Sequence, residues 1–530
     1  MAVDLGGSIA SATSGPDGQT PYDEVVYPTF VHDYLHPDRI ASIAWLRGLD
    51  IAPATDCRYV ELGCGDGATL LALAIAHPNS RFVGVDLAPT VVERGRREIE
   101  AVGVSNLELL VGDLADPTLA DRIEALPLVD GRPFDHVVSH GVYSWVPDSA
   151  RQGLLTTAAR LLAPHGSLYL SYNAYPGGFL RELTRGILTF HVKDRDVRLA
   201  PDAEMSEAIG IMRLLADARE GDLWGRVISA ELSMLDNRSP ASLRHDELGE
   251  INDQFWLHEM ADAMASHGFT LLGEADDLGD LRVQWSEQVA DMLEPFWDQP
   301  VVREQYIDLL FGRRFRRTLW SRTDAAPTWP WRLGRFDGML VGSSAHFDDL
   351  PDDGLDLAAG VPATLIGGRA DATTLTIDGT LAKAALAAMI SARPEHLPFT
   401  KVVTEARRLA AATGNPTGRT VVDDAAALEH LLISLHPTQV ISLRNTQPTY
   451  PLWPSERPVV SPLIRRQLET HCTAVATLSA RVLEIDDDQT AEFLLACDGT
   501  RTVAELVEMT GAGDVEPFLL RLAAMGAFIS

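Results

Sequence analysis

The chain has 530 residues, of which 46% are hydrophobic and 22% are charged. This is the composition of a globular protein and excludes wholesale disorder. Its 75 acidic residues outnumber its 44 basic residues, and the formal net charge is −31. A field of that sign repels phosphate backbones and anionic lipid, so we expect neither nucleic acid nor membrane as a partner. It would attract basic polypeptides instead.

Cysteine usage and the first residues indicate the compartment. The cysteines are Cys57, Cys64, Cys472 and Cys497. They are too few and too scattered for a disulfide framework or a zinc site, so we expect no metal and a reducing cytoplasm. Residues 1–20 have no basic start and no apolar core, which predicts a disordered N-terminus rather than a signal peptide.

The chain next alternates short apolar runs with amphipathic helical stretches. The pattern predicts strands at 58–63, 81–86, 107–113, 134–140 and 167–173, with helices at 68–78, 88–103 and 148–166. Strands that alternate with helices form a parallel sheet covered on both faces. We therefore expect an α/β fold of the doubly wound, Rossmann-like kind.

Beyond residue 173 the alternation stops and later returns. Residues 178–250 are mostly helical in pattern, whereas a helix at 255–268 and strands at 269–275 and 313–322 resume the α/β rhythm. We expect a first domain over 21–325 that contains a helical insertion at about 178–250. Breaks rich in proline and tryptophan predict a middle α/β domain over 326–455 and a C-terminal domain over 456–530, both winged-helix-like.

The strongest motif is VELGCGDGATLLALA at 60–74. Three glycines, Gly63, Gly65 and Gly67, let the backbone turn sharply and approach a ligand closely, and the following helix N-terminus is a site of positive potential. Asp86 lies 19 residues beyond Gly67, at the end of the second strand. There a carboxylate can accept the hydroxyls of a ribose.

Spacing and charge distinguish between two cofactors for this loop. The NAD fingerprint GxGxxG requires its third glycine where Ala68 stands. Acidic Glu61 precedes the first glycine and Asp66 lies inside the loop, so a pyrophosphate would be repelled. S-adenosylmethionine has no phosphate and carries cationic amino and sulfonium groups, and Asp113 at the end of the third strand can bind its adenine amine. The alternative is a glycine-rich turn without a ligand.

Residues 58–173 resemble class I S-adenosylmethionine-dependent methyltransferases. Further segments resemble the methyltransferases that carry a methyltransferase regulatory domain, among them the rickettsial protein lysine methyltransferases. These segments are YDEVVYPTF (22–30), HPDRI (36–40), ELGCGDG (61–67), HGVYSWVP (140–147) and SYNAYPG (171–177). The similarity extends through 252–276, 313–320 and 498–506.

The resemblance implies a cofactor site with S-adenosylhomocysteine as product. It places the methionine part at Glu61 and the glycine loop, the ribose at Asp86, and the adenine at Asp113 and Leu114. The implied cofactor-binding residues are Glu61, Gly63, Cys64, Gly65, Gly67, Asp86, Leu87, Asp113, Leu114, His140 and Gly141. The (N/D/S)PP(Y/F) motif of small-molecule and DNA N-methyltransferases is replaced by HGVYSWVP, so the acceptor is not carried over.

Aromatic residues cluster near the expected strand ends. A lysine acceptor must lose its proton before it is methylated, and a methylated ammonium is attracted to aromatic faces. We expect Tyr143 and Tyr172 as catalytic residues. The expected substrate-contacting residues are Tyr22, Tyr27, Tyr143, Trp145 and Tyr175. Each of these rings could equally be part of a packed core.

The sequence thus predicts a cytoplasmic S-adenosylmethionine-dependent methyltransferase that acts on an amine of a protein or peptide, with a basic substrate and lysine as the favoured acceptor. One alternative is an N- or O-methyltransferase of a small-molecule or peptide natural product. A second is a regulatory protein that binds the cofactor without turnover. A homodimer through the helical insertion is implied by the family alone.

Overall fold

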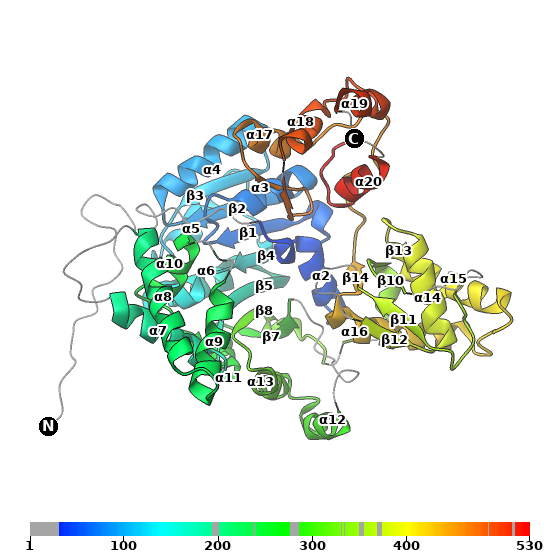
Figure 1. Cartoon of the computed structure of the whole chain (residues 1–530), viewed down its shortest axis with the longest axis horizontal. Helices are drawn as coiled ribbons and strands as arrows, with labels where there is room; N and C mark the ends of the chain where they lie inside the picture. The colour runs from blue at the N-terminus through cyan, green and yellow to red at the C-terminus, as the bar shows by residue number, and fades with distance from the viewer. Residues whose placement is uncertain are drawn as a thin grey trace.

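The computed structural model describes residues 31–192, 201–236, 238, 240–275, 286–329, 331–332, 334–348, 355–367, 374–485, 487–510 and 515–530. The expectations for residues 1–20, Tyr22 and Tyr27 lie outside these residues. Figure 1 shows one large sheet with helices on both faces, a group of helices beside it and a separate smaller lobe.

The large sheet is the frame of the first half of the chain. Its central strands are β1 (Arg58–Leu62), β2 (Arg81–Asp86), β3 (Leu107–Val111), β4 (Phe134–Ser139) and β5 (Leu162–Ala174). They are mutually parallel in the order β3-β2-β1-β4-β5. Two later strands, β8 (Phe315–Arg322) and β7 (Phe269–Glu274), extend the sheet beyond β5, and β8 is antiparallel to both neighbours. The predicted Rossmann-like α/β fold is confirmed.

Helices cover both faces of this sheet because successive strand residues point to opposite sides. On one face lie α2 (Pro37–Leu46), α3 (Ala68–Ala76) and α4 (Pro89–Val102), packed with Tyr59 and Phe82. The other face is covered by α5 (Leu119–Glu124), α6 (Asp148–Leu161) and α11 (Leu257–Ser266). The carboxyl ends of β1 to β5 therefore share one edge between the two helical layers.

Two predicted boundaries were wrong. The helix expected to run to residue 166 ends at Leu161, and β5 begins at Leu162. Pro164 and Gly166 in this stretch disfavour helix, which is consistent with the early end. Phe255, expected in a helix, lies in the short strand β6 (Gln254–Phe255), which pairs in parallel with the end of β5. The extended backbone of Trp256 delays α11 to Leu257.

The described residues of the region predicted as an insertion form four helices. They are α7 (Gly178–Val192), α8 (Pro201–Ala218), α9 (Leu223–Leu235) and α10 (Pro240–Leu248). They share an apolar cluster of their own that includes Leu188, Met212 and Ile228, and they lie together as the green group at one side of Figure 1. Two more helices, α12 (Glu287–Leu293) and α13 (Pro300–Phe311), lead to β8.

The rest of the chain forms smaller sheets and short helices. The middle part contains β9 (Leu340–Ser343), β10 (His346–Phe347), β11 (Ala363–Ile366), β12 (Thr374–Ile377), α14 (Thr380–Ser391), β13 (Leu397–Pro398), α15 (Phe399–Ala412), α16 (Val421–Leu435) and β14 (Ile441–Arg444). The last part contains α17 (Pro462–Glu469), β15 (Ala474–Ala476), β16 (Val482–Glu484), α18 (Asp488–Ala496), α19 (Val503–Thr510) and α20 (Glu516–Ala524). The proposed domain boundaries and the winged-helix likeness stay predictions.

Both the middle part and the last part of the chain contact the first part through polar interactions. The buried carboxylate of Asp38 in α2 accepts hydrogen bonds from the backbone N–H groups of Asn445 and Thr446. In the last part, the guanidinium of Arg466 in α17 pairs with Glu98 in α4 at 3.1 Å. In the part of the chain that the structure describes, none of the helices combines the length and apolar character needed to cross a membrane.

Candidate functional site

The glycine loop joins β1 to α3 at the carboxyl edge of the sheet. Gly63, Gly65 and Gly67 all have positive φ, at 86°, 57° and 71°. A Cβ atom at Gly63 would lie 2.2 Å from Cγ2 of Val142, so this glycine lets the loop after β4 approach β1. No described atom lies within 4 Å of the Cβ position at Gly65. The backbone there is open to a ligand.

Asp86 fixes the loop to the end of β2. Its carboxylate accepts hydrogen bonds from the N–H of Gly65 at 2.8 Å and the N–H of Ala88 at 3.0 Å. Burial raises the pKa of Asp86. Each carboxylate oxygen has more than one lone pair, so Asp86 can accept hydroxyls of a ligand as well. Next to it, the apolar side chain of Leu87 is 41% exposed.

Glu61 lies in β1, immediately below the loop, with a buried side chain. Burial, together with the negative charges of Asp86 and Asp66, raises the pKa of Glu61 to about 8. A carboxyl in this state is mostly protonated at neutral pH, and a cation bound beside it would favour its ionised form. Asp66, inside the loop, pairs with Arg94 at 2.9 Å.

Asp113 and Leu114 follow β3, which is the neighbour of β2. The N–H of Gly112 donates to the backbone oxygen of Asp86 at 2.9 Å, which places the two strand ends side by side. Asp113 is exposed and accepts from the N–H of Ala115 at 2.8 Å. Leu114 is buried. The structure thus brings the expected ribose and adenine residues together at one edge.

His140 ends the β4 segment inside a group of rings. Its Nε2 is 3.0 Å from the hydroxyl of Tyr34, in the short helix η1 (Asp33–Leu35), and its Nδ1 is 3.0 Å from the hydroxyl of Tyr169. Burial, with the nearby His32 and Arg317, lowers the pKa of His140 well below its ordinary value. The ring is therefore neutral. The N–H of Gly141 donates to Oγ of Ser171 at 2.8 Å.

Tyr34 and Tyr169 escaped the sequence interpretation. Tyr34 lies between two segments that resemble the family, 22–30 and 36–40, and Tyr169 lies in the predicted strand 167–173. The sequence offered one signal, the alternation of side chains along a strand. Tyr169 and Ser171 are two residues apart in β5, so their side chains point to the same face, which is the face on which His140 lies. That face could be assigned only once the sheet order was known.

The two expected catalytic tyrosines lie in the core. Tyr172 is fully buried, and its hydroxyl accepts a hydrogen bond from Oγ1 of Thr318 at 3.3 Å. It belongs to the opposite face of the sheet from Tyr169. Tyr143 is also buried, with its ring 5.2 Å from that of Phe255. Their catalytic roles stay predictions, and these positions do not support them.

The other expected substrate residues lie nearer the surface. Trp145 is half-buried, and the Arg181 guanidinium lies 5.8 Å from its ring centroid. Tyr175 is half-buried as well and donates a hydrogen bond from its hydroxyl to Glu182. Both residues follow strands whose carboxyl ends meet at the glycine-loop edge, so the structure brings them to the side of the sheet that was expected.

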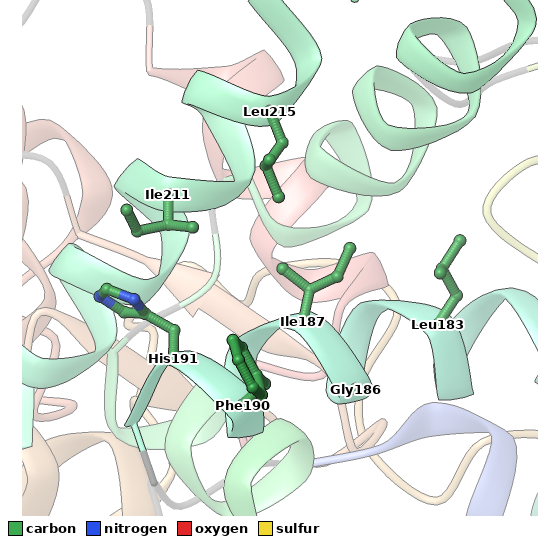
Figure 2. Close-up of a pocket in the computed structure, with 7 residues that line it drawn as sticks. All are labelled: Leu183, Gly186, Ile187, Phe190, His191, Ile211 and Leu215. Carbon is green, nitrogen blue, oxygen red and sulfur yellow. The ribbon is translucent and has the colours of Figure 1, made fainter. Parts of the chain in front are cut away.

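An apolar groove of about 460 Å³ lies elsewhere, between α7 and α8 (Figure 2). It is lined by Leu183, Gly186, Ile187, Phe190, His191, Ile211 and Leu215. The ring of His191 is 3.7 Å from Glu207. The groove belongs to the helical group and not to the strand ends, so it is separate from the glycine-loop site.

Two family models match parts of the chain. Residues 60–166 match the model described as a methyltransferase domain. The chain carries a methyltransferase domain. Residues 239–322 match a second model, described as a predicted methyltransferase regulatory domain, which spans α10 to β8. The methyltransferase domain includes the glycine loop, Asp86, Asp113 and His140, and its cofactor is S-adenosylmethionine.

Similar proteins extend the match to most of the chain. The uncharacterized protein RP789 of Rickettsia prowazekii is 28% identical over 326 residues, which are 60% of this chain and 55% of that protein. The uncharacterized protein RP028 of the same organism is 28% identical over 47% of this chain and 96% of its own length. The structure of PKMT2 from Rickettsia typhi covers 95% of this chain and 100% of its own, with a TM-score of 0.78 at 20% identity. Its complex with AdoHcy gives a TM-score of 0.79.

The site residues fit S-adenosylmethionine. A cationic amino or sulfonium group would favour ionisation of Glu61, the ribose hydroxyls can be accepted by Asp86, and the exposed Leu87 offers apolar surface beside them. Among the described residues, no atom within 4 Å of the Cβ position at Gly65 would block contact between its backbone and the ligand.

Proposed function

We propose that this chain is an S-adenosylmethionine-dependent methyltransferase whose acceptor is the amine of a lysine side chain in a protein or peptide. The observation that carries the methyltransferase part is the arrangement of Glu61 and Asp86 on adjacent strands below an open glycine loop. The lysine part is supported by the likeness to the Rickettsia typhi structure named PKMT2 over almost the whole chain. The net charge of −31 suits a basic polypeptide substrate.

Each residue of the site has a distinct task in this reaction. When bound, S-adenosylmethionine supplies a methyl group activated by the sulfonium. Glu61 would hold the cationic end of this cofactor and Asp86 its ribose, so that the methyl group is fixed while water is excluded. The acceptor nitrogen forms the new N–C bond, the S–CH₃ bond breaks with its electrons going to sulfur, and one proton leaves the nitrogen.

The proton has a route through the residues around His140. Tyr34, His140 and Tyr169 form a connected set of hydroxyls and ring nitrogens, and His140 is neutral. A neutral imidazole between two hydroxyls can accept a proton on one nitrogen as it passes one on from the other. On the Tyr34 side the proton would continue to Nδ1 of the half-buried His32, 2.7 Å from the Tyr34 hydroxyl, and from there to solvent. We assign this set to the removal of the lysine proton.

The test is transfer of a radiolabelled methyl group from S-adenosylmethionine into an extract of the source cell, separated into protein and small-molecule fractions. We expect label in a discrete protein band that survives mild base and yields methyllysine on hydrolysis. Label confined to small molecules would contradict the proposal and assign the enzyme to metabolite methylation. If AdoHcy binds but neither fraction is labelled, the regulatory alternative is favoured.

A further inference from the structure

Three aromatic rings meet where β5 ends and where α7 and α11 begin. Tyr175 follows β5 directly, Phe179 is in the first turn of α7, and Trp256 precedes α11. The ring centroid of Tyr175 lies 4.4 Å from that of Phe179 and 5.2 Å from that of Trp256. Phe179 and Trp256 are 6.1 Å apart. We call these three residues the aromatic platform.

The platform is accessible from outside. Phe179 is 53% exposed, and Tyr175 and Trp256 are half-buried. Rings that pack only to stabilise a fold are normally covered more completely, and clustered exposed aromatics mark binding surfaces. The rings of the platform touch one another, so a ligand would contact their outer faces rather than a space between them.

Carboxylates surround the platform. The hydroxyl of Tyr175 donates to Glu182, and burial, this hydrogen bond and the charges of Glu182, Glu259 and Asp253 raise the pKa of Tyr175 to about 12. All three carboxylates have exposed side chains. Aromatic faces beside negative charge attract an ammonium or guanidinium group.

The neighbouring arginines have partners other than Glu182 and Glu259, and Arg185 donates its hydrogen bonds to the backbone oxygens of Asp246 and Gly249. Arg151 pairs with Asp148 at 2.8 Å and with Asp253. Arg181 pairs with the buried Glu247 at 3.0 Å. Glu182 and Glu259 therefore remain as negative charges at the rim of the platform.

The platform lies close to the methyl-transfer site. In the sheet, Asn173 of β5 pairs with Phe315 of β8, and the Phe315 ring is 5.9 Å from the ring of His140. Tyr175 is two residues further along the chain, which is about 7 Å in extended backbone. A side chain held on the platform and an acceptor near His140 can therefore belong to the same short peptide.

We propose that the aromatic platform binds a lysine or arginine side chain of the substrate polypeptide, next to the residue that is methylated. This inference rests on the proposed function and names a binding determinant for its substrate. The Trp256 ring also stacks with His258, at 6.2 Å between centroids. A cationic side chain would therefore stack mainly on the exposed ring of Phe179, beside Trp256, with Glu182 and Glu259 around its charge. The enzyme would then favour acceptors in basic segments.

The test compares Trp256→Ala and Phe179→Ala with the wild-type chain. The probe is a lysine- and arginine-rich peptide, titrated by calorimetry in the presence of AdoHcy and also used as a substrate. We expect the Kd and KM for the peptide to rise at least tenfold in each variant, with little change in kcat or in the Kd for AdoHcy. Trp256→Phe keeps an aromatic face and should retain most of the affinity.

Phe311→Ala is the matched control. Phe311 is another phenylalanine at a helix end, in α13, and is 57% exposed. It does not belong to the platform, so peptide binding should be unchanged. Glu182→Gln should weaken peptide binding severalfold and reduce its salt dependence. Because Phe179 is exposed, its alanine variant should fold even if Trp256→Ala does not.

Two results would overturn the inference. One is unchanged peptide affinity in folded Phe179→Ala and Trp256→Ala, which would make the platform simple packing. The other is failure of the wild-type chain to bind the basic peptide. Peptide binding is measured without turnover, so a wild-type chain that binds the peptide through the platform but transfers no methyl group would refute the proposed function alone.

Discussion

The hydroxyl of Tyr34 lies 3.0 Å from Nε2 of His140, although 106 positions separate the two residues. The same hydroxyl is 2.7 Å from Nδ1 of His32, and the Arg317 guanidinium lies 4.5 Å from the centroid of the tyrosine ring. On its other side, His140 meets Tyr169. The segment before α2 therefore helps to fix the orientation of the ring that ends β4, beside the glycine loop.

Tyr34→Phe should slow methyl transfer by about 10- to 100-fold, because it breaks the connected path between His32 and His140. Loss of two hydrogen bonds should also cost roughly 2 kcal/mol of unfolding free energy. The rate is measured by single-turnover methyl transfer and the stability by denaturant unfolding. Tyr306→Phe, in α13, is the control and should leave the rate unchanged. An unaltered rate in Tyr34→Phe would remove this residue from the proton route.

Asp86→Asn should weaken AdoHcy binding at least tenfold, about 1.4 kcal/mol or more. Asparagine has one acceptor oxygen in place of the two of aspartate. Its NH₂ group would face the N–H of Gly65 or of Ala88, where a donor meets a donor and no hydrogen bond forms. Calorimetry measures the affinity, and circular dichroism checks that the fold is kept. Asp116→Asn is the control, since Asp116 also accepts from loop groups, at Thr118, but lies outside the glycine loop. Full affinity in Asp86→Asn would mean that the ribose lies elsewhere.

Glu61→Gln should stabilise the cofactor-free protein at high pH. The pKa of Glu61 is raised to about 8 in the folded state, so between about pH 4.5 and 8 the folded chain holds a proton that the unfolded chain has released. Stability from this group therefore falls as pH rises through that window. Glutamine does not ionise, and the variant should gain roughly 3–5 kcal/mol over the wild type at pH 8 and little at pH 4.5. Thermal unfolding at both pH values checks this.

The same substitution should weaken cofactor binding. In the wild type, the cation of the ligand would drive Glu61 to release its proton, which calorimetry in buffers of different ionisation enthalpy detects. Asp86, Asp66 and Cys64 face the same region, so the difference between wild type and Glu61→Gln isolates the contribution of Glu61. Equal proton release in both proteins would show that another group titrates.

Gly95→Ala should displace the glycine loop, because Gly95 in α4 packs against the backbone of that loop. A Cβ at this position in α4 would lie 2.1 Å from the backbone oxygen of Asp66, which cannot move without the loop. We expect a loss of about 1–3 kcal/mol in stability and weaker AdoHcy binding. Gly186→Ala, in α7, is the control, because no described atom lies within 4 Å of its Cβ position. That variant should be up to about 1 kcal/mol more stable.

Local patterns in the sequence were sufficient for the sheet and the loop. Alternation of apolar runs and helices predicted β1 to β5, and glycine spacing with Glu61 and Asp86 predicted the cofactor site, because strand pattern and turn chemistry depend on neighbouring residues. The later strand β8 was also predicted. That β8 lies between β5 and β7, antiparallel to both, was known only from the strand pairing in the structure.

Only tertiary structure decided which aromatic residues lie on the face of the sheet where His140 lies. Tyr169 and Tyr172 lie in one strand three residues apart and point to opposite faces, so the choice between them depended on the sheet order and on which helices cover each face. In the aromatic platform, Tyr175 and Phe179 contact Trp256, although the helices α8 to α10 lie between them in the sequence. The pairing of Tyr34 with His140 is equally long in range. Such contacts form when segments far apart in the sequence pack against the same sheet, so a pattern of neighbouring residues does not predict them.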